Sequence, residues 1–303
     1  MPSILATGIS KSYGEVKALT DISLSIGKGE LYGLIGPDGA GKTTLFRILT
    51  SLMVQDSGKA EVEGFDTVRD FKSLRKILGY MPGRFSLYHD LTVEENLAFF
   101  ATIFGTTIHE NYDLVKDIYV QIEPFKDRKA GKLSGGMKQK LALSCALIHK
   151  PEVLFLDEPT TGVDAVSRKE FWEMLRKLQQ KGITIMVSTP YMDEASLCDH
   201  VALIQKGKIL GINTPSGIVA QYRYPLVRVI TDNMFMLPEH LRQFPGAESA
   251  YRFGDSVHFS SHTEIHAHDL AAFLEKNGHG NISIEKTIPT IEDCFMALLK
   301  NES

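Results

Sequence analysis

The sequence predicts an α/β fold: a core of parallel strands, an antiparallel β layer, a helical subdomain and a small C-terminal α+β domain. Three observations support this prediction. Short apolar runs alternate with helical patterns between residues 31 and 189, which is typical of parallel strands joined by helices. Residues 1–30 alternate apolar and polar positions, as an antiparallel layer does. After a composition break at 217–225, strands and helices follow in a different order.

The predicted core begins with an apolar run that leads into a glycine-rich loop and then into a helix. The predicted core strands are 31–36, 153–159 and 183–189, and the predicted core helices are 43–52 and 168–180. Residues 92–149 carry mostly helical patterns. Thr92 and Glu95 have the spacing of a capping box at the start of a helix over 93–104, and a second helix is predicted over 111–122.

The C-terminal part shows the order βαββαβ followed by one helix, which is the split-βαβ pattern. The predicted elements are strand 226–231, helix 238–244, strands 247–252 and 256–260, helix 264–277, strand 281–287 and helix 290–300. We therefore predict one domain over 1–222, with a helical subdomain at about 88–147, and an accessory or dimerisation domain over 226–303.

Composition excludes several classes of protein. A net charge of −4 argues against a nucleic-acid-binding surface, and the three widely spaced cysteines, without a CxxC motif, argue against a disulfide framework. The N-terminus does not have the pattern of a signal peptide, and no apolar stretch approaches the roughly 18 residues that cross a bilayer. Five histidines between 258 and 279 are interpreted as a solvated polar face, because their spacing does not form a convincing zinc pattern.

Residues 36–43, GPDGAGKT, fit the pattern G-x-x-x-x-G-K-[ST] between a strand and a helix, which predicts a P-loop NTPase core. In such a loop, successive backbone N–H groups and the helix N-terminus bind phosphate oxygens. Lys42 would place its charge on the β and γ phosphates, and Thr43 would offer its hydroxyl to Mg²⁺. The candidate binding residues of this loop are Gly36, Pro37, Asp38, Gly39, Ala40, Gly41, Lys42, Thr43 and Thr44.

The apolar strand 153–157 ends in two acids, Asp157 and Glu158, although a buried strand rarely ends in charges unless they face a site. In a P-loop enzyme, Asp157 would hold Mg²⁺ through water and Glu158 would polarise the attacking water. We therefore predict Lys42 and Glu158 as catalytic residues, and Thr43 and Asp157 as metal-binding residues.

Residues 133–139, LSGGMKQ, together with the phosphate loop, the LFLDEP strand and GVDA at 162–165, resemble ABC-type ATPase domains over about residues 1–220. Ser134 is suited to cap a helix and bind an anion, while Gly135 and Gly136 allow close backbone approach. The resemblance implies that ATP and Mg²⁺ are bound, and that this segment covers the γ-phosphate held by a second protomer. It also places Tyr13 where an aromatic ring stacks on adenine, although a strand aromatic is the alternative, and Asp164 in the loop that crosses the dimer interface.

Two positions depart from the family pattern. Pro190 occupies the slot of a histidine that contacts the γ-phosphate, and Gly83 occupies the slot of a glutamine that helps to hold Mg²⁺ and water. Loss of one auxiliary donor costs about two to three orders of magnitude in rate. Because Glu158 is present, we predict a slow ATPase. Neighbours that could compensate in part are Thr189, Tyr191 and Arg84.

A finer resemblance rests on LTVEENLAFFATIFG, STPYMDEA and PTIEDCFMALL at 289–299. These segments resemble ATPase subunits of drug-resistance and polyketide-antibiotic exporters, whose membrane permease is a separate chain. The resemblance implies an ATP-hydrolysing subunit at the cytoplasmic face of a bacterial membrane, with a permease and a second ATPase subunit as partners and no nucleic acid. In the family, a short permease helix reaches the region of residues 85–88.

Two alternatives stay open at this stage. Gly83 and Pro190 also fit a regulatory subunit that binds ATP but hydrolyses it negligibly. The third interpretation is a soluble ATPase without a membrane partner.

Overall fold

The computed structural model describes residues 1–301, which form fourteen strands, ten helices and three short 3-10 helices. The chain divides into two compact units, Met1–Pro215 and Ser216–Ser303. The division precedes the predicted boundary at 222–226, so most of helix α7 (Pro215–Ala220) belongs to the second unit. No helix within residues 1–301 is long and apolar enough to cross a membrane.

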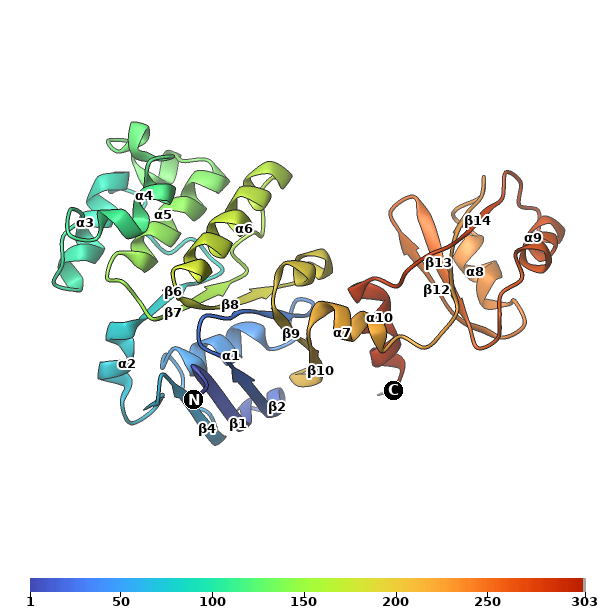
Figure 1. The fold of residues 1–303 in the computed structure, drawn as a ribbon, viewed down its shortest axis with the longest axis horizontal. Coiled ribbons are helices and arrows are strands. Elements are labelled where there is room, and N and C mark those ends of the chain that lie inside the picture. The colour runs from blue at the N-terminus through green and yellow to red at the C-terminus, as the bar shows by residue number, and fades with distance from the viewer. Residues whose placement is uncertain (302–303) are drawn as a thin grey trace. The chain divides into compact units, whose positions relative to one another are not determined.

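A six-stranded sheet forms the centre of the first unit, in the order β10-β9-β3-β8-β7-β6 (Figure 1). Its strands are β3 (Leu31–Ile35), β6 (Leu78–Met81), β7 (Val153–Asp157), β8 (Thr184–Thr189), β9 (His200–Gln205) and β10 (Lys208–Asn213). Strands β9, β3, β8, β7 and β6 pair in parallel, and β10 pairs antiparallel with β9. The predicted strands 31–36, 153–159 and 183–189 are confirmed as β3, β7 and β8.

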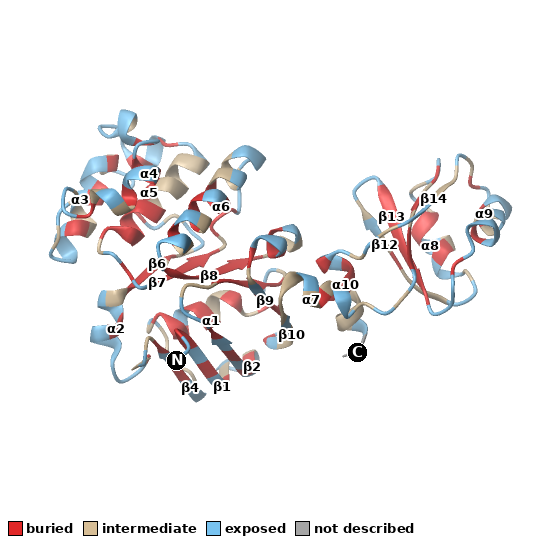
Figure 2. Cartoon of the chain, viewed as in Figure 1, coloured by how far each residue is buried: buried red, intermediate tan, exposed pale blue. Residues whose placement is uncertain are grey.

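The predicted antiparallel layer is a second sheet, in the order β2-β1-β4-β5. Its strands are β1 (Ile4–Tyr13), β2 (Val16–Ile26), β4 (Ser57–Val62) and β5 (Phe65–Asp66). Helix α1 (Lys42–Leu49) lies between the two sheets, and α6 (Ala165–Gln180) covers the opposite face of the parallel sheet (Figure 1). The main core lies around α1, where the Phe46 and Phe155 rings meet edge to face at 5.7 Å, and Figure 2 shows the parallel strands buried.

The helical part of the first unit contains α3 (Val93–Ile103), α4 (Tyr112–Tyr119) and α5 (Gly135–Leu147), and α2 (Phe71–Ile77) precedes β6. The 3-10 helices span Glu123–Phe125, Ala130–Lys132 and Met192–Leu197. The predicted capping box is confirmed: the Glu95 amide donates to Thr92 Oγ1 at 3.1 Å, and the Thr92 amide donates to Glu95 Oε2 at 2.8 Å.

The second unit has a four-stranded antiparallel sheet in the order β12-β13-β11-β14. Its elements are β11 (Leu226–Ile230), α8 (Leu237–Arg242), β12 (Ala247–Phe253), β13 (Ser256–Ser261), α9 (Ala267–Lys276), β14 (Ser283–Lys286) and α10 (Ile291–Asn301). The first and fourth strands of the βαββαβ order are neighbours, as the split-βαβ pattern requires. Helices α8 and α9 share a core with Val229 and Phe259 of this sheet.

The histidines of this unit do not all belong to a solvated face, which corrects the prediction. His258 and His279 are buried. His258 Nδ1 lies 3.0 Å from both carboxylate oxygens of Asp293, so it connects β13 to α10. His279 lies between His240, at 2.8 Å, and the Thr231 hydroxyl, at 3.0 Å. Because strand periodicity shows only alternation, the sequence did not reveal that α10 covers one of these side chains.

Candidate functional site

The loop 36–41 joins the end of β3 to the start of α1, and close packing requires glycine at Gly36 and Gly41. A Cβ atom on Gly36 would lie 2.1 Å from the Ile204 carbonyl oxygen. Gly41 has φ = 106°, which side chains rarely permit, and a Cβ there would lie 2.6 Å from the Ala18 carbonyl oxygen. The loop backbone is thus pressed against β9 and β2, which directs the start of α1.

The start of α1 has the properties of an anion-binding site. No side chain of the described residues caps this helix at Gly41, and its first turn contains no acid. The helix dipole and free N–H groups favour a negative charge at this point. Lys42, the first residue of α1, adds a formal positive charge although its side chain is only 3% exposed. These features fit a phosphate group.

The Lys42 ammonium lies at the centre of the predicted residues. It donates to the carbonyl oxygens of Gly36, at 2.8 Å, and Pro37, at 3.0 Å, and pairs with Glu158 Oε1 at 3.0 Å. The three donors of the ammonium are therefore directed at three oxygens within the chain. Binding of a phosphate requires Lys42 to exchange at least one of these contacts for a phosphate oxygen.

The two acids after β7 are held by Ser188 of the neighbouring strand β8. The Ser188 hydroxyl donates to Asp157 Oδ1 at 2.6 Å and accepts from the Glu158 amide at 3.0 Å. Glu158 has φ = 50°, an uncommon conformation for a residue with a side chain. The turn at Glu158 brings its carboxylate to Lys42, so the acids of one strand end and the lysine of the loop converge.

The residues predicted to bind Mg²⁺ are few. Asp157 is 2% exposed, and Thr43 is half-buried in the first turn of α1. Within the described part of the chain, no cluster of three or more His, Cys, Asp or Glu side chains could hold a metal. This donor set fits Mg²⁺, which typically binds through one or two carboxylates, water and substrate phosphates. Mg²⁺ would here depend on the phosphates for much of its coordination.

Tyr80 of strand β6 also lies near the acids of this region. Burial, together with the negative charge of Asp157, raises the pKa of Tyr80 to about 12 despite the opposing effect of Arg47. The phenol therefore stays protonated at neutral pH.

Tyr13 lies at the edge of the loop region and is 47% exposed, as a ring that stacks on a planar base must be. Its hydroxyl lies 3.5 Å from the Thr44 hydroxyl and 3.1 Å from Met53 Sδ. Thr44 follows Thr43 in α1, so Tyr13 is close to the phosphate loop. Asp38, Gly39 and Ala40 complete that loop.

Ser134 caps α5, where its hydroxyl accepts from the Met137 amide at 3.3 Å. A Cβ on Gly136 would lie 2.8 Å from Ser167 Oγ, and one on Gly135 would lie 3.4 Å from the Gly162 carbonyl oxygen. The serine–glycine segment thus packs at the start of α6, whose own cap is Asp164. The structure brings Lys42, Asp157 and Glu158 together, whereas this segment packs on the loop that leads into α6.

The two departures from the family pattern lie close to the acids. A Cβ on Gly83 would lie 3.1 Å from the Asp157 carbonyl oxygen, so a larger residue needs a small shift of the loop or strand. Thr189, which precedes Pro190, donates to Glu194 Oε2 and accepts from the Tyr191 amide. Of the candidates for partial compensation, Thr189 and Tyr191 are engaged inside the chain, whereas Arg84 is exposed, as the alternative of a surface arginine or a partner contact also predicts.

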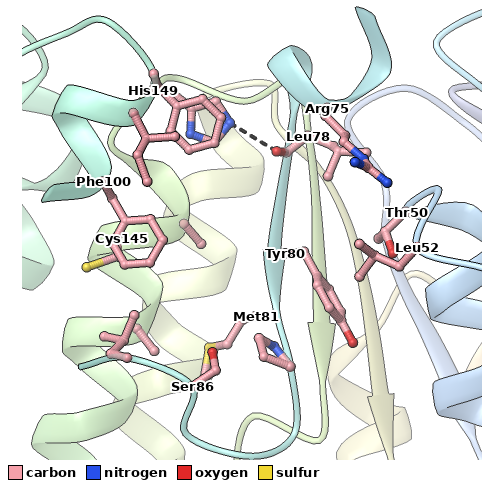
Figure 3. Close-up of a pocket in the computed structure, with 16 residues that line it drawn as sticks. Thr50, Leu52, Arg75, Leu78, Tyr80, Met81, Ser86, Phe100, Cys145 and His149 are labelled. Carbon is pink, nitrogen blue, oxygen red and sulfur yellow. Dashed lines mark hydrogen bonds between the residues drawn. The ribbon is translucent and has the colours of Figure 1, made fainter. Parts of the chain in front are cut away.

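An apolar cavity of about 390 Å³ lies beside strand β6. Figure 3 shows Phe100 and Cys145, on helices, and His149, in the turn after α5, at one wall, with Leu52 and Tyr80 across the cavity. Its lining continues through Met81 into the segment that contains Gly83 and Phe85, and it includes Ser86 and Leu87. The cavity therefore lies between strand β6 and the helical part of the unit, and its lining includes Pro82, next to Gly83.

Comparison with known proteins identifies relatives of this chain. A family model described as ABC transporter matches residues 19–161. The chain is 38% identical to the "Probable multidrug ABC transporter ATP-binding protein YbhF" of Escherichia coli over 98% of its own length, but it spans only about half, 52%, of that protein. It is 36% identical to the Nod factor export ATP-binding protein I of Rhizobium sp., covering 97% of this chain and 96% of that protein.

Two solved structures of ABC transporter proteins are also similar to this chain. A subunit from Clostridium perfringens, cbiO1, described as part of the ABC transporter complex cbiONQ, matches 73% of this chain and 91% of its own, with a TM-score of 0.65 and 26% identity. The ATP-binding cassette MJ0796, in a dimer bound to ADP and Pi, matches 70% of this chain and 98% of its own, with a TM-score of 0.63 and 25% identity.

Proposed function

The chain belongs to the ABC transporter family of ATP-binding proteins, and from this premise we propose that it binds and hydrolyses Mg-ATP to drive a separate membrane exporter. The observation that carries the proposal is the convergence of Lys42, Glu158 and Asp157 at the ends of β3, β7 and β8. An uncapped helix N-terminus beside them suits the phosphates.

Each residue has a distinct role in the proposed reaction. Lys42 and the loop amides bind the β and γ phosphates and offset the charge that develops during transfer. Thr43 and Asp157 would hold Mg²⁺, which would supply positive charge to offset that of the phosphates. Glu158 orients and polarises the attacking water. Tyr13 lies where it could stack on the base.

The proposed active state is a dimer, and the support for it comes from the relatives. MJ0796 forms a dimer, and this chain has its own serine–glycine segment at the start of α5. We propose that Ser134, Gly135 and Gly136 of one protomer cover the γ-phosphate bound by Lys42 of the other. The second unit, beginning at Ser216, is proposed to pair or regulate such subunits.

The membrane partner is proposed to be a permease at the cytoplasmic face of a bacterial membrane. Names of relatives such as the daunorubicin resistance ATP-binding protein DrrA2 of Streptomyces coeruleorubidus support a drug exporter. The apolar cavity of Figure 3 and the adjoining Tyr88, which is 52% exposed, offer apolar surface to a short permease helix. Its position next to Gly83 would connect the permease to the site of hydrolysis.

A second candidate function is a regulatory subunit that binds ATP without appreciable hydrolysis. One observation favours this candidate. The Thr189 hydroxyl already donates to the Glu194 carboxylate, so it cannot easily replace the histidine missing at Pro190. Gly83 likewise has no side chain to offer to Mg²⁺. The two candidates differ in turnover and share nucleotide binding.

The test uses purified protein alone and with its co-purified permease. Lys42→Ala should abolish nucleotide binding, and Glu158→Gln should retain ATP and trap a dimer without phosphate release. A matched control is Glu170→Gln, which changes a half-exposed acid on α6 that pairs with Lys140. Wild-type phosphate release that depends on Lys42 and Glu158 supports the ATPase. Nucleotide binding without such release, even with the permease present, would favour the regulatory subunit.

A further inference from the structure

Glu194 is a buried acid for which the proposed reaction has no direct use. It lies in the 3-10 helix Met192–Leu197 after β8, and only 1% of it is exposed. A buried carboxylate is costly unless hydrogen bonds and charges compensate it. Its neighbour Asp193 is 76% exposed at the side chain, as acids in such a segment usually are. The difference between the two acids shows that the fold provides specific partners for Glu194.

The hydrogen-bond and ion-pair partners of Glu194 come from three different segments of the chain. The Thr160 hydroxyl donates to Glu194 Oε1 at 2.8 Å, and the Thr189 hydroxyl donates to Glu194 Oε2 at 2.5 Å. Both threonines are buried. Arg168 of α6 adds its positive charge, with Nε 3.7 Å from Glu194 Oε1. Each carboxylate oxygen therefore holds a different segment of the chain.

The two threonines lie close in the sequence to Glu158 and Pro190. Thr160 lies two residues after Glu158, in the turn that leads to Asp164 and α6. Thr189 is the last residue of β8 and precedes Pro190. Its hydroxyl also accepts from the Tyr191 amide at 3.0 Å, and the Tyr191 ring lies under the Arg168 guanidinium at 4.3 Å. The segment around Pro190 is thus held by contacts within the chain.

We propose that Glu194 is a positioning residue, whose carboxylate binds Thr160 and Thr189 and so fixes the Glu158 turn against the end of β8. Glu158 has a strained φ of 50°, and a strained turn persists only when its surroundings hold it. The Ser188 contacts hold the Glu158 amide to β8, and the Glu194 contacts add a second link, through Thr160 and Thr189, between the Glu158 turn and the segment that leads into Pro190. The effect on rate rests on the proposed ATP hydrolysis, whereas the effect on the turn does not.

The test uses the full-length chain and four substitutions. Thr160→Val keeps the shape but removes the donor, and Glu194→Gln removes the charge. Thr160→Ser keeps the hydroxyl donor and should therefore restore the activity that Thr160→Val loses. Asp193→Asn is the matched control, because it removes an exposed acid 3.6 Å from the same Arg168 without touching either threonine. Thermal melts measure the folded fraction, so that rates are expressed per folded molecule.

We expect Thr160→Val and Glu194→Gln to lower kcat about tenfold, since supporting partners typically contribute 10- to 100-fold. KM for Mg-ATP should change less than about threefold, because Lys42 and the loop remain intact. Thr160→Ser and Asp193→Asn should behave like the wild type. A role in stability alone would leave kcat per folded molecule unchanged in Thr160→Val and Glu194→Gln, and that result would overturn the proposal. A kcat for Thr160→Ser as low as that of Thr160→Val would overturn it too.

A second measurement separates this proposal from the ATPase itself. If the wild type shows no Lys42-dependent phosphate release, the proposed hydrolysis fails, and amide hydrogen exchange in residues 158–165 then decides the role of Glu194. Exchange there should be faster in Thr160→Val and Glu194→Gln than in the wild type and Asp193→Asn. Equal exchange in all four proteins would refute the proposed positioning of the turn.

Discussion

Replacing Ser188 by alanine should destabilise the first unit far more than loss of an ordinary buried hydroxyl. The Ser188 hydroxyl is fully buried, donates to the Asp157 carboxylate at 2.6 Å and accepts from the Glu158 amide. A hydrogen bond to a charged group contributes about 1.5–3 kcal/mol. The Glu158 amide keeps a bond to the Ser188 carbonyl oxygen at 3.0 Å, so most of the loss falls on Asp157.

The expected change in free energy of unfolding is therefore about 1.5–3 kcal/mol. For a unit of this size, each kcal/mol shifts Tm by about 2–4 °C, which gives a fall of roughly 3–12 °C. Thermal and urea unfolding, followed by circular dichroism, would measure both quantities. Nucleotide affinity in Mg²⁺ should fall as well, because the proposed metal-binding carboxylate loses its support.

Ser144→Ala is the matched control. Ser144 is equally buried, but its hydroxyl donates at 2.9 Å to the Lys140 carbonyl oxygen within helix α5. Alanine favours a helix and removes only a neutral contact, so the change should stay below about 1 kcal/mol. The reasoning is refuted if Ser188→Ala is as stable as the wild type, or if both substitutions cost the same.

Three further predictions test other parts of the chain. Burial lowers the pKa of His149 below its usual value of 6.5, so the unfolded chain binds more protons than the folded chain at mildly acidic pH. The free energy of unfolding should therefore be greatest above about pH 6.5 and fall towards pH 5. His149→Phe should reduce that fall, as measured by urea unfolding at several pH values. Phe46→Ala should cost about 3–5 kcal/mol in urea unfolding, because Phe46 is fully buried against Phe155. Tyr88→Ala should leave ATP binding intact but reduce export per ATP hydrolysed in vesicles, and unchanged coupling would contradict the proposed docking.

Local motifs made much of the fold predictable. The phosphate loop, the capping box at Thr92 and the cap at Ser134 depend on residues within a few positions of each other, so their geometry is encoded in one short segment. The C-terminal sheet could be predicted because its order follows from the number and sequence of its elements. Helix α6 starts at Ala165 instead of the predicted 168, because Asp164 caps it through the Val166 and Ser167 amides.

Contacts between distant segments could not be predicted. Glu194 looks like a surface acid in STPYMDEA, and its burial depends on Thr160, which lies 34 residues earlier. Ser188 is one small polar residue at the end of an apolar strand, and its role depends on the register that pairs it with Asp157. Such contacts require the order of strands in the sheet, which a pattern of apolar residues does not specify.

Contacts between distant segments also surround the positions of the unusual residues Gly83 and Pro190. Gly83 lies where a Cβ would meet Asp157, and Pro190 follows Thr189, whose hydroxyl binds Glu194. At both positions the chain lacks a polar side chain for the nucleotide, while nearby hydrogen bonds hold the acids in place. A site held in this way would lose charge contacts in phosphoryl transfer without losing the placement of Glu158. Slow turnover with normal nucleotide affinity is the outcome that this arrangement favours, and it distinguishes a weakened site from a disordered one.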